Sequence, residues 1–430
     1  MLSRMALLVV AAATGAVAAT GHAVSCTTDE DCSLNGVCAT GGCVCDPGWT
    51  TLPFGLNNAM SPGCGYLDFE ASPVSECGPA CAFHGGKGGV DRNTTSWGGS
   101  VQKADGNYWM FAAEMSRGCD LSHWQTNSQV VSAVADSPLG PFVRQDLVIP
   151  PWSHNPQAVV APDGTWVIFT LGPGFGRRAQ ANCTRDRGQR AKVKDSEEAE
   201  EQRTTFAAHA AGSSLAPVNF TVHSAPGPQG PWTPHTFSPV GWNVSWSLQN
   251  PGNWNPAPVF LPDGSLRVMA HTDWAPWAGE TILTAAHWKG PYTVRGSDLL
   301  DHCAFCEEDP FMWRDKRGHW HVLYHRMFDP YGALDPHWGK WKAQPASNPV
   351  PRGWSGGHAF SRDGFSWSNW SRCYNTSVTL TDGKVVEHNR RERPKLLFDS
   401  DGSPTHLYNG VFDAAGSSVT YTIVAPIKQQ

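Results

Sequence analysis

A motif that occurs five times after residue 95 constrains the fold of this chain more than any other feature. Each copy is an apolar stretch, a turn with glycine and a second apolar stretch, as in "NPQAVVAPDGTWVIF" and "NPAPVFLPDGSLRVM". Apolar residues that alternate on both sides of an Asp-Gly-type turn predict a β-hairpin. The turn glycines are Gly106, Gly164, Gly264, Gly318 and Gly402. One unit repeated along a chain predicts a repeat architecture.

A further strand pattern with its own glycine turn follows four of the hairpins, in "VVSAVADSPLGPF", "FTVHSAPGPQGPW", "ILTAAHWKGPY" and "GHAFSRDGFSW". The last copy closes with "VTYTIVAPI". Copies of about four strands each predict an all-β, five-bladed propeller over residues 67–430, in which the first strand of every blade lines the central axis. Insertions at residues 176–214 and 329–355 make the spacing irregular.

The first 22 residues predict a secretory signal peptide, because Arg4 precedes a run of small and apolar residues and a small-residue cleavage region. No other segment has the apolar length of a membrane span, so we expect a secreted protein without a membrane anchor. The net charge of −6, without a long basic stretch, argues against a nucleic-acid partner. Six predicted N-glycosylation sites agree with export: Asn93, Asn182, Asn219, Asn243, Asn369 and Asn375.

Residues 23–66 carry six closely spaced cysteines, in a stretch that includes "CSLNGVCATGGCVCDPGW". So short a module cannot bury a sufficient core, so disulfides are expected, although six cysteines alone permit many pairings. The stretch resembles an epidermal-growth-factor-like (EGF-like) module. This resemblance implies the pairs Cys26–Cys38, Cys32–Cys43 and Cys45–Cys64 and a spacer or protein-contact role. The acidic pattern of calcium-binding members is missing, so we expect no calcium there.

Seven further cysteines leave at least one thiol without a partner, and they are Cys77, Cys81, Cys119, Cys183, Cys303, Cys306 and Cys373. Cys183 lies in a charged segment with few apolar residues and is the best candidate for the free thiol. The "CAFC" at 303–306 has the spacing of half a zinc site, but in an exported chain disulfides are the stronger expectation. We therefore predict no metal and no cofactor.

Polar and aromatic residues stand where the first strand of each blade begins. The pairs are Ser96-Trp97, His154-Asn155, Trp254-Asn255, Glu308-Asp309 and Glu392-Arg393. Because the first strands of a propeller surround its axis, these pairs are expected to meet at one axial mouth. The alternative is that they are solvated turn residues at strand ends.

The "DG-x-W" turns and "GPW/GPF" strand ends resemble the five-bladed propeller glycosidases of the arabinanase, levansucrase and invertase superfamily, nearest to glycoside hydrolase family 43. The resemblance covers residues 95–425. It implies a general-base Asp before the proline of one blade, a pKa-tuning Asp at that place in the next blade and a general-acid Glu one residue earlier in the third. Counting from the third copy, these places hold Asn255, Asp309 and Glu392. An amide cannot abstract a proton, so Asp273 or Glu308 is the candidate base.

The predicted function is glycoside hydrolysis or related carbohydrate processing, with a non-catalytic carbohydrate-binding propeller as the alternative. Glu392, Asp309 and Glu308 are the candidate catalytic residues, and an ionised Asp309 would raise the pKa of Glu392. Arg393 beside Glu392 works against that acid role and could instead bind an anionic sugar. Trp97 and Trp254 are expected to stack on sugar rings. The remaining candidates for ligand contact are Asn255, Asn155, Asp273, His154, His271 and His325.

Overall fold

The computed structural model describes residues 24–51, 63–172, 174, 180–183, 220–237, 239–240, 255–272, 279–297, 307–326, 356–412 and 420–429. The signal-peptide prediction lies outside these residues, as do residues 329–355 and most of 176–214. The same holds for the predictions made for Asn219, Asn243, Trp254, Asp273, Cys303 and Cys306.

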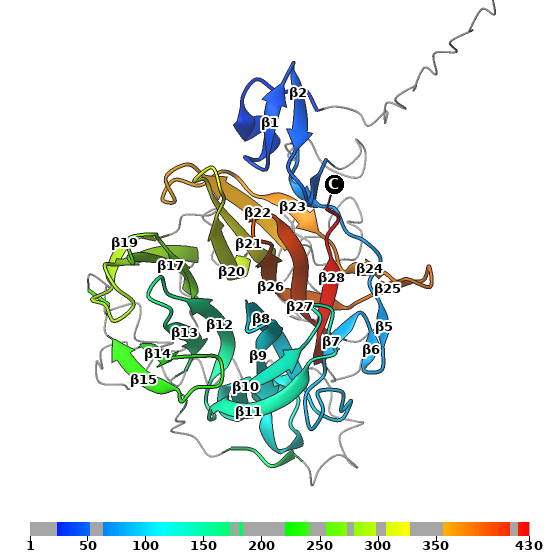
Figure 1. Cartoon of the computed structure of the whole chain (residues 1–430), viewed down its shortest axis with the longest axis vertical. Coiled ribbons are helices and arrows are strands. Elements are labelled where there is room, and N and C mark those ends of the chain that lie inside the picture. The colour runs from blue at the N-terminus through cyan, green and yellow to red at the C-terminus, as the bar shows by residue number, and fades with distance from the viewer. Residues whose placement is uncertain are drawn as a thin grey trace, which may run out of the picture.

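Five four-stranded antiparallel sheets surround a common centre, so the predicted five-bladed propeller is confirmed (Figure 1). From the axis outward, blade one contains β8 (Ser96–Ala104), β9 (Asn107–Met115), β10 (Ser128–Ala135) and β11 (Val143–Ile149). Blade two contains β12 (His154–Val160), β13 (Trp166–Leu171), β14 (Phe220–Ala225) and β15 (Thr233–Phe237). Blade three contains β16 (Ala257–Phe260), β17 (Leu266–Thr272), β18 (Gly279–Ala285) and β19 (Thr293–Ser297). Blade four contains β20 (Glu307–Arg314), β21 (Trp320–Arg326), β22 (Gly356–Ser361) and β23 (Ser371–Tyr374).

Blade five joins the two ends of the propeller. It contains β26 (Arg390–Phe398), β27 (Pro404–Phe412), β28 (Thr420–Pro426) and, as its outer strand, β7 (Cys81–Phe83) from before blade one. The hydroxyl of Thr420 donates to the Ser96 carbonyl at 2.8 Å, and that of Thr422 donates to the Gly98 carbonyl at 2.9 Å. These bonds tie blade five to the inner strand of blade one and close the ring.

The predicted hairpin turns are confirmed. All five turn glycines have φ between 78° and 90°, a left-handed conformation that glycine adopts without a steric penalty. The smaller elements are η1 (Asp29–Cys32), β1 (Gly36–Ala39), β2 (Gly42–Cys45), β3 (Trp49–Thr50), β4 (Tyr66–Leu67), β5 (Val74–Ser75), β6 (Gly78–Pro79), η2 (Ser116–Gly118), η3 (Leu121–His123), α1 (Trp124–Asn127), β24 (Ser377–Thr379) and β25 (Val385–Glu387). Within the described ranges, no helix has the length and apolar character needed to cross a membrane.

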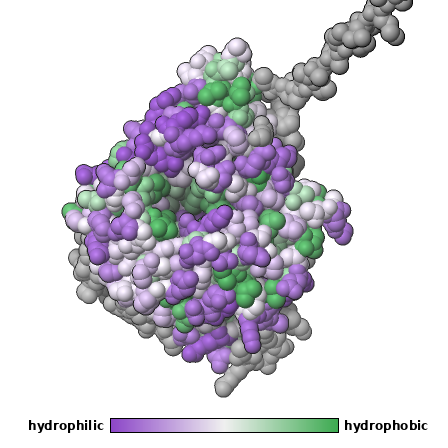
Figure 2. All heavy atoms as spheres, in the orientation of Figure 1, coloured by the Kyte–Doolittle hydropathy of each residue, from purple (hydrophilic) through white to green (hydrophobic). Residues whose placement is uncertain are grey.

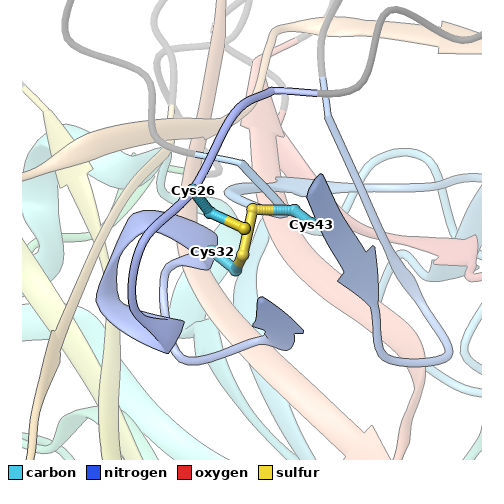
Figure 3. Close-up of side chains that lie close together, drawn as sticks. All are labelled: Cys26, Cys32 and Cys43. Carbon is cyan, nitrogen blue, oxygen red and sulfur yellow. A yellow bond between two sulfur atoms is a disulfide. The ribbon is translucent and has the colours of Figure 1, made fainter. Parts of the chain in front are cut away.

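The N-terminal cysteines form Cys26–Cys38, Cys32–Cys43 and Cys45–Cys64, the pairing that the resemblance implied. Figure 3 shows the Cys32–Cys43 bridge beside Cys26. The sulfurs of these three residues lie close enough together to hold a metal ion, but all are consumed in disulfides and none is a thiolate ligand. That this segment is an EGF-like module, with a boundary near residue 66, stays a prediction.

The prediction for Cys183 is wrong. Cys183 pairs with Cys119 across a sequence separation of 64, and Cys77 pairs with Cys81. Of the cysteines that the structure describes, the free one is Cys373, which is buried on β23. The local charge around Cys183 was misleading because the pairing depends on a cysteine in a distant part of the chain.

The cysteine-rich segment packs against the propeller. Trp49 on β3 stacks on Trp313 of β20 with ring centroids 6.3 Å apart, and its centroid is 5.1 Å from that of His358 on β22. The Arg317 guanidinium donates to the Asp46 carboxylate and to the carbonyl of Leu34. A cavity of about 30 Å³ at this contact has room for about one water and is no sugar site. The segment therefore shares a hydrophobic core with blades four and five.

Candidate active site

The inner strands of blades one, two, four and five change register at their axial ends. On β20, Glu308 pairs with His325 and Phe311 with Leu323, so one extra residue is accommodated on the inner strand. The same bulge occurs at His154/Gln157, Trp97/Ser100 and Glu392/Lys395. Bulges of this kind redirect side chains and are common beside active sites.

A left-handed residue stands at this place in every blade. The φ angles are 60° at Gly98, 50° at Asn155, 36° at Asn255, 63° at Asp309 and 57° at Arg393. Non-glycine residues adopt this conformation uncommonly, and Asn and Asp do so more readily than most others. This conformation recurs in all five blades and places the five residues around the axis. Seen along the axis, the molecule is hollowed near its centre (Figure 2).

The structure corrects the frame of the first blade by one residue. Trp97 occupies the register of Glu308 and Glu392, so Gly98 is the counterpart of Asp309. The pair predicted for blade one, Ser96-Trp97, therefore stands one residue too early. The turn of blade one is shorter: residues 105–106 separate its paired residues, whereas residues 161–165 do so in blade two.

Two arginines pair with the three candidate acids. The guanidinium of Arg393 donates to Asp309, and its Nη2 lies 3.5 Å from Oε1 of Glu308. Arg390 donates through Nε to Glu392. The expectation for Arg393 is therefore corrected: Arg390 pairs with Glu392, while Arg393 pairs with the blade-four carboxylates.

Gly98 makes room for Arg393. A Cβ atom placed on Gly98 would lie 3.0 Å from Cβ of Arg393, closer than nearly all real contacts of this kind. Where blades two to four carry Asn155, Asn255 and Asp309, blade one has no side chain, and the stem of Arg393 fills that side. The ion pair between Arg393 and Asp309 therefore depends on glycine at this place.

The acids converge on His325, which is buried on β21. Its Nε2 lies 3.6 Å from Oε1 of Glu392, and the ligand atoms of Glu308, Asp309 and His325 all lie within 4.8 Å of one another. These three residues meet the distance requirement for a cation. Because the Arg393 guanidinium already pairs with both carboxylates, a cation would have to displace it, and we assign no metal here.

Blades two and three contribute an amide pair. Nδ2 of Asn155 donates to Oδ1 of Asn255 at 2.5 Å, and both side chains are buried. Next to them His154 shares a 2.7 Å hydrogen bond with Ser128, and its ring stacks on Trp124 at 5.3 Å. Burial first, and then the charge of Arg393, lower the pKa of His154 well below its usual value, so this ring is neutral.

The prediction that Trp97 stacks on a sugar is corrected. Trp97 is 1% exposed and its ring meets Phe412 edge to face at 5.4 Å. The ring also packs on Gly410, where a Cβ atom would come within 2.7 Å of it. Trp97 therefore packs between blades one and five. Trp254 and Asp273 lie outside the described residues, as does the side chain of His271.

Sequence reasoning missed Trp124 and Lys395. Lys395 on β26 is buried, and its Nζ lies 3.5 Å from the Pro310 carbonyl. Burial first, and then the charge of Arg393, lower the pKa of Lys395 to about 7. A lysine within the apolar run "RPKLLF" is a signal that could have been noticed; nothing local marks Trp124 among 20 tryptophans.

No family model matches this chain and no curated protein matches it. Among solved structures it is similar to the catalytic domain of a family 62 α-L-arabinofuranosidase from Coprinopsis cinerea, with 12% identity, a TM-score of 0.51 and coverage of 84% of this chain and 97% of that one. The arabinofuranosidase PaAbf62A from Podospora anserina matches with 10% identity, a TM-score of 0.49 and coverage of 84% and 98%. A thermostable family 43 glycoside hydrolase matches with 11% identity, a TM-score of 0.44 and coverage of 81% and 93%. The chain thus has the fold of the five-bladed propeller glycosidases.

Proposed function

We propose that this protein is a secreted glycoside hydrolase, or a closely related carbohydrate-processing enzyme, with its active site in an axial pocket. The observation that carries this proposal is the convergence of Glu308, Asp309 and Glu392 around His325, at the end of the propeller axis where the backbone turns left-handed. Glycoside hydrolysis needs two carboxyl groups with separate roles on either side of the scissile bond. The glycosidase neighbours add support at the level of fold.

Different partners suit these carboxyl groups to different roles. Arg393 favours charge on Asp309, which suits it to accept a proton from water or to stabilise a developing positive charge. Glu392 lies 3.6 Å from the imidazole of His325 and accepts a hydrogen bond from Arg390. Because Arg390 favours the ionised form of Glu392, the general-acid role requires that substrate binding displaces this arginine. Glu308, which Arg393 also touches, is the alternative base.

Secretion is proposed on the five disulfides of the described residues. Four of the glycosylation candidates, Asn93, Asn182, Asn369 and Asn375, are exposed and accessible to modification. A binding role for glycans without turnover is the second candidate, because Asn255 stands where the resemblance places the base.

The test is a screen of polysaccharides and aryl glycosides by release of reducing sugar or phenol. Glu392→Gln keeps the shape but removes the proton, so turnover of natural substrate should fall by about 10²–10⁴, with binding retained. Aryl glycosides with good leaving groups should lose much less, because they need no protonation. Glu387→Gln, in the β25 strand outside the site, is the matched control.

Asp309→Asn should shift the acidic limb of the pH–rate profile, because it removes the charge that faces Arg393. Full turnover in both the Glu392 and Asp309 variants would show that these carboxylates are not the catalytic residues. Glycan binding without turnover in the unmodified protein would select the second candidate.

A further inference from the structure

We infer that the axial pocket recognises the acetamido group of an N-acetylated amino sugar, and that Asn155 and Asn255 are the residues that read it. This inference rests on the proposed function, since it names the substrate class of the same pocket. The starting observation is that the two amides use only part of their hydrogen-bonding capacity on each other.

Each amide leaves one buried polar atom unsatisfied. Among the described residues, Oδ1 of Asn155 and Nδ2 of Asn255 have no hydrogen-bond partner, although the two residues are only 8% and 4% exposed. An unpaired buried donor or acceptor is costly, so such atoms in a site are expected to be satisfied by the ligand. The mutual hydrogen bond holds this acceptor and this donor at a fixed separation.

The complement to this pair is one donor and one acceptor. Turning both amides over exchanges the roles of the two residues, and the free groups remain one donor and one acceptor. A ligand carboxylate or sulfate has only acceptors and would face the free carbonyl oxygen. An ammonium group has only donors and would face the free N–H. A secondary amide carries one N–H and one C=O in a rigid plane and can satisfy both atoms.

Sugar hydroxyls could also satisfy both unpaired amide atoms, but a carboxylate is a better partner for hydroxyls and is already present at the axial end of blade four. Asp309 occupies the equivalent place in blade four and accepts charge-assisted hydrogen bonds from hydroxyls. Blades two and three instead carry neutral amides at this place, and neighbouring His154 is neutral too.

The experiment compares sugars that differ in this one substituent. Calorimetric titration of the full chain uses chitotriose, cellotriose and the glucosamine trimer, which carry acetamido, hydroxyl and ammonium groups at the same carbon. N-acetylgalactosamine and galactose form a second matched pair. We expect the acetamido member of at least one pair to bind about tenfold or more tighter, and the ammonium trimer to bind weakest.

Asn255→Asp is the informative variant, because Asp tolerates the left-handed backbone of Asn255 while it removes both amide N–H donors. It should erase the acetamido preference, so that the acetamido and hydroxyl sugars bind this variant with similar affinity. Asn107→Asp, in the hairpin turn of blade one, is the matched control and should keep the preference.

Equal binding of acetamido and hydroxyl sugars by the unmodified protein would overturn the inference. So would an Asn255→Asp variant that keeps the preference. Turnover by the unmodified protein of glycans without acetamido groups, with no preference for acetamido sugars, overturns this inference and leaves the proposed function standing. Acetamido-selective binding without any turnover leaves this inference standing and overturns the proposed enzymatic function.

Discussion

Acid should destabilise this protein partly through one buried histidine, His358 on β22. Its side chain is fully buried at the contact between the cysteine-rich segment and blade four. Nε2 of His358 lies 3.2 Å from Nδ1 of His321 and 3.4 Å from Nδ2 of Asn35, and the ring of Trp49 packs on it. Burial first, and then the charge of His321, hold the pKa of His358 well below the ordinary value of 6.5.

The sign follows from proton binding. Below pH 6.5 the unfolded chain takes up a proton at this position, whereas the folded chain does not, so stability is lost as the pH falls. At pH 5.5, one unit below the unfolded pKa, His358 should lower the free energy of unfolding by about 1.4 kcal/mol relative to pH 7.5. His321, whose pKa burial also lowers, acts in the same direction.

The assay is urea unfolding at pH 7.5 and pH 5.5 with the disulfides intact. His358→Gln cannot take up the proton in either state, so its loss of stability between the two pH values should be smaller than that of the unmodified protein by about 1.4 kcal/mol. His406→Gln is the positive control, because burial lowers the pKa of His406 to about 4 and the same reduction is expected. If the His406 variant shows the reduction and the His358 variant does not, the neutral state assigned to His358 is wrong.

Three further outcomes are expected. Lys395→Met should raise the free energy of unfolding at pH 7 by on the order of a few kcal/mol. The pKa of Lys395 is about 7 in the folded protein, so between pH 10.5 and pH 7 the unfolded chain binds the proton more tightly and the folded protein loses stability. Equal stability of the variant and the unmodified protein in urea unfolding would contradict this. Trp49→Ala should cost about 3–5 kcal/mol by the same measurement, since it leaves a cavity between the cysteine-rich segment and blade four. Cys119→Ser with Cys183→Ser should cost about 4 kcal/mol from the loop entropy that the bridge removes, and unchanged thermal melting would exclude that bridge.

Much of the fold could be predicted because its signals are local. A hairpin is specified by alternating residues on either side of a turn, and the turn requires a glycine in the left-handed conformation, as at Gly164 and Gly264. Five such signals imply five blades whatever the loops between them contain. Similarly, Glu308, Asp309 and Glu392 could be predicted to lie at the axis, because every inner strand of a propeller begins there.

The pairing of those side chains was decided by the tertiary structure. Whether Arg390 or Arg393 reaches Glu392 depends on a bulge that inserts one residue, and one residue reverses the direction of a side chain along a strand. The blade-one pair Ser96-Trp97 was placed one residue too early for a related reason, the shorter turn in blade one, and Gly98 is the counterpart of Asp309.

Contacts between distant segments left no local trace at all. Strand β7 closes blade five through three residues without a strand pattern of their own, and Cys183 finds Cys119 across a separation of 64. Nothing in the sequence distinguishes Trp49 among the 20 tryptophans, yet its ring packs on Trp313 at the contact between the cysteine-rich segment and blade four. Local periodicity determines elements and their order, whereas these contacts depend on how completed blades are closed and packed in space.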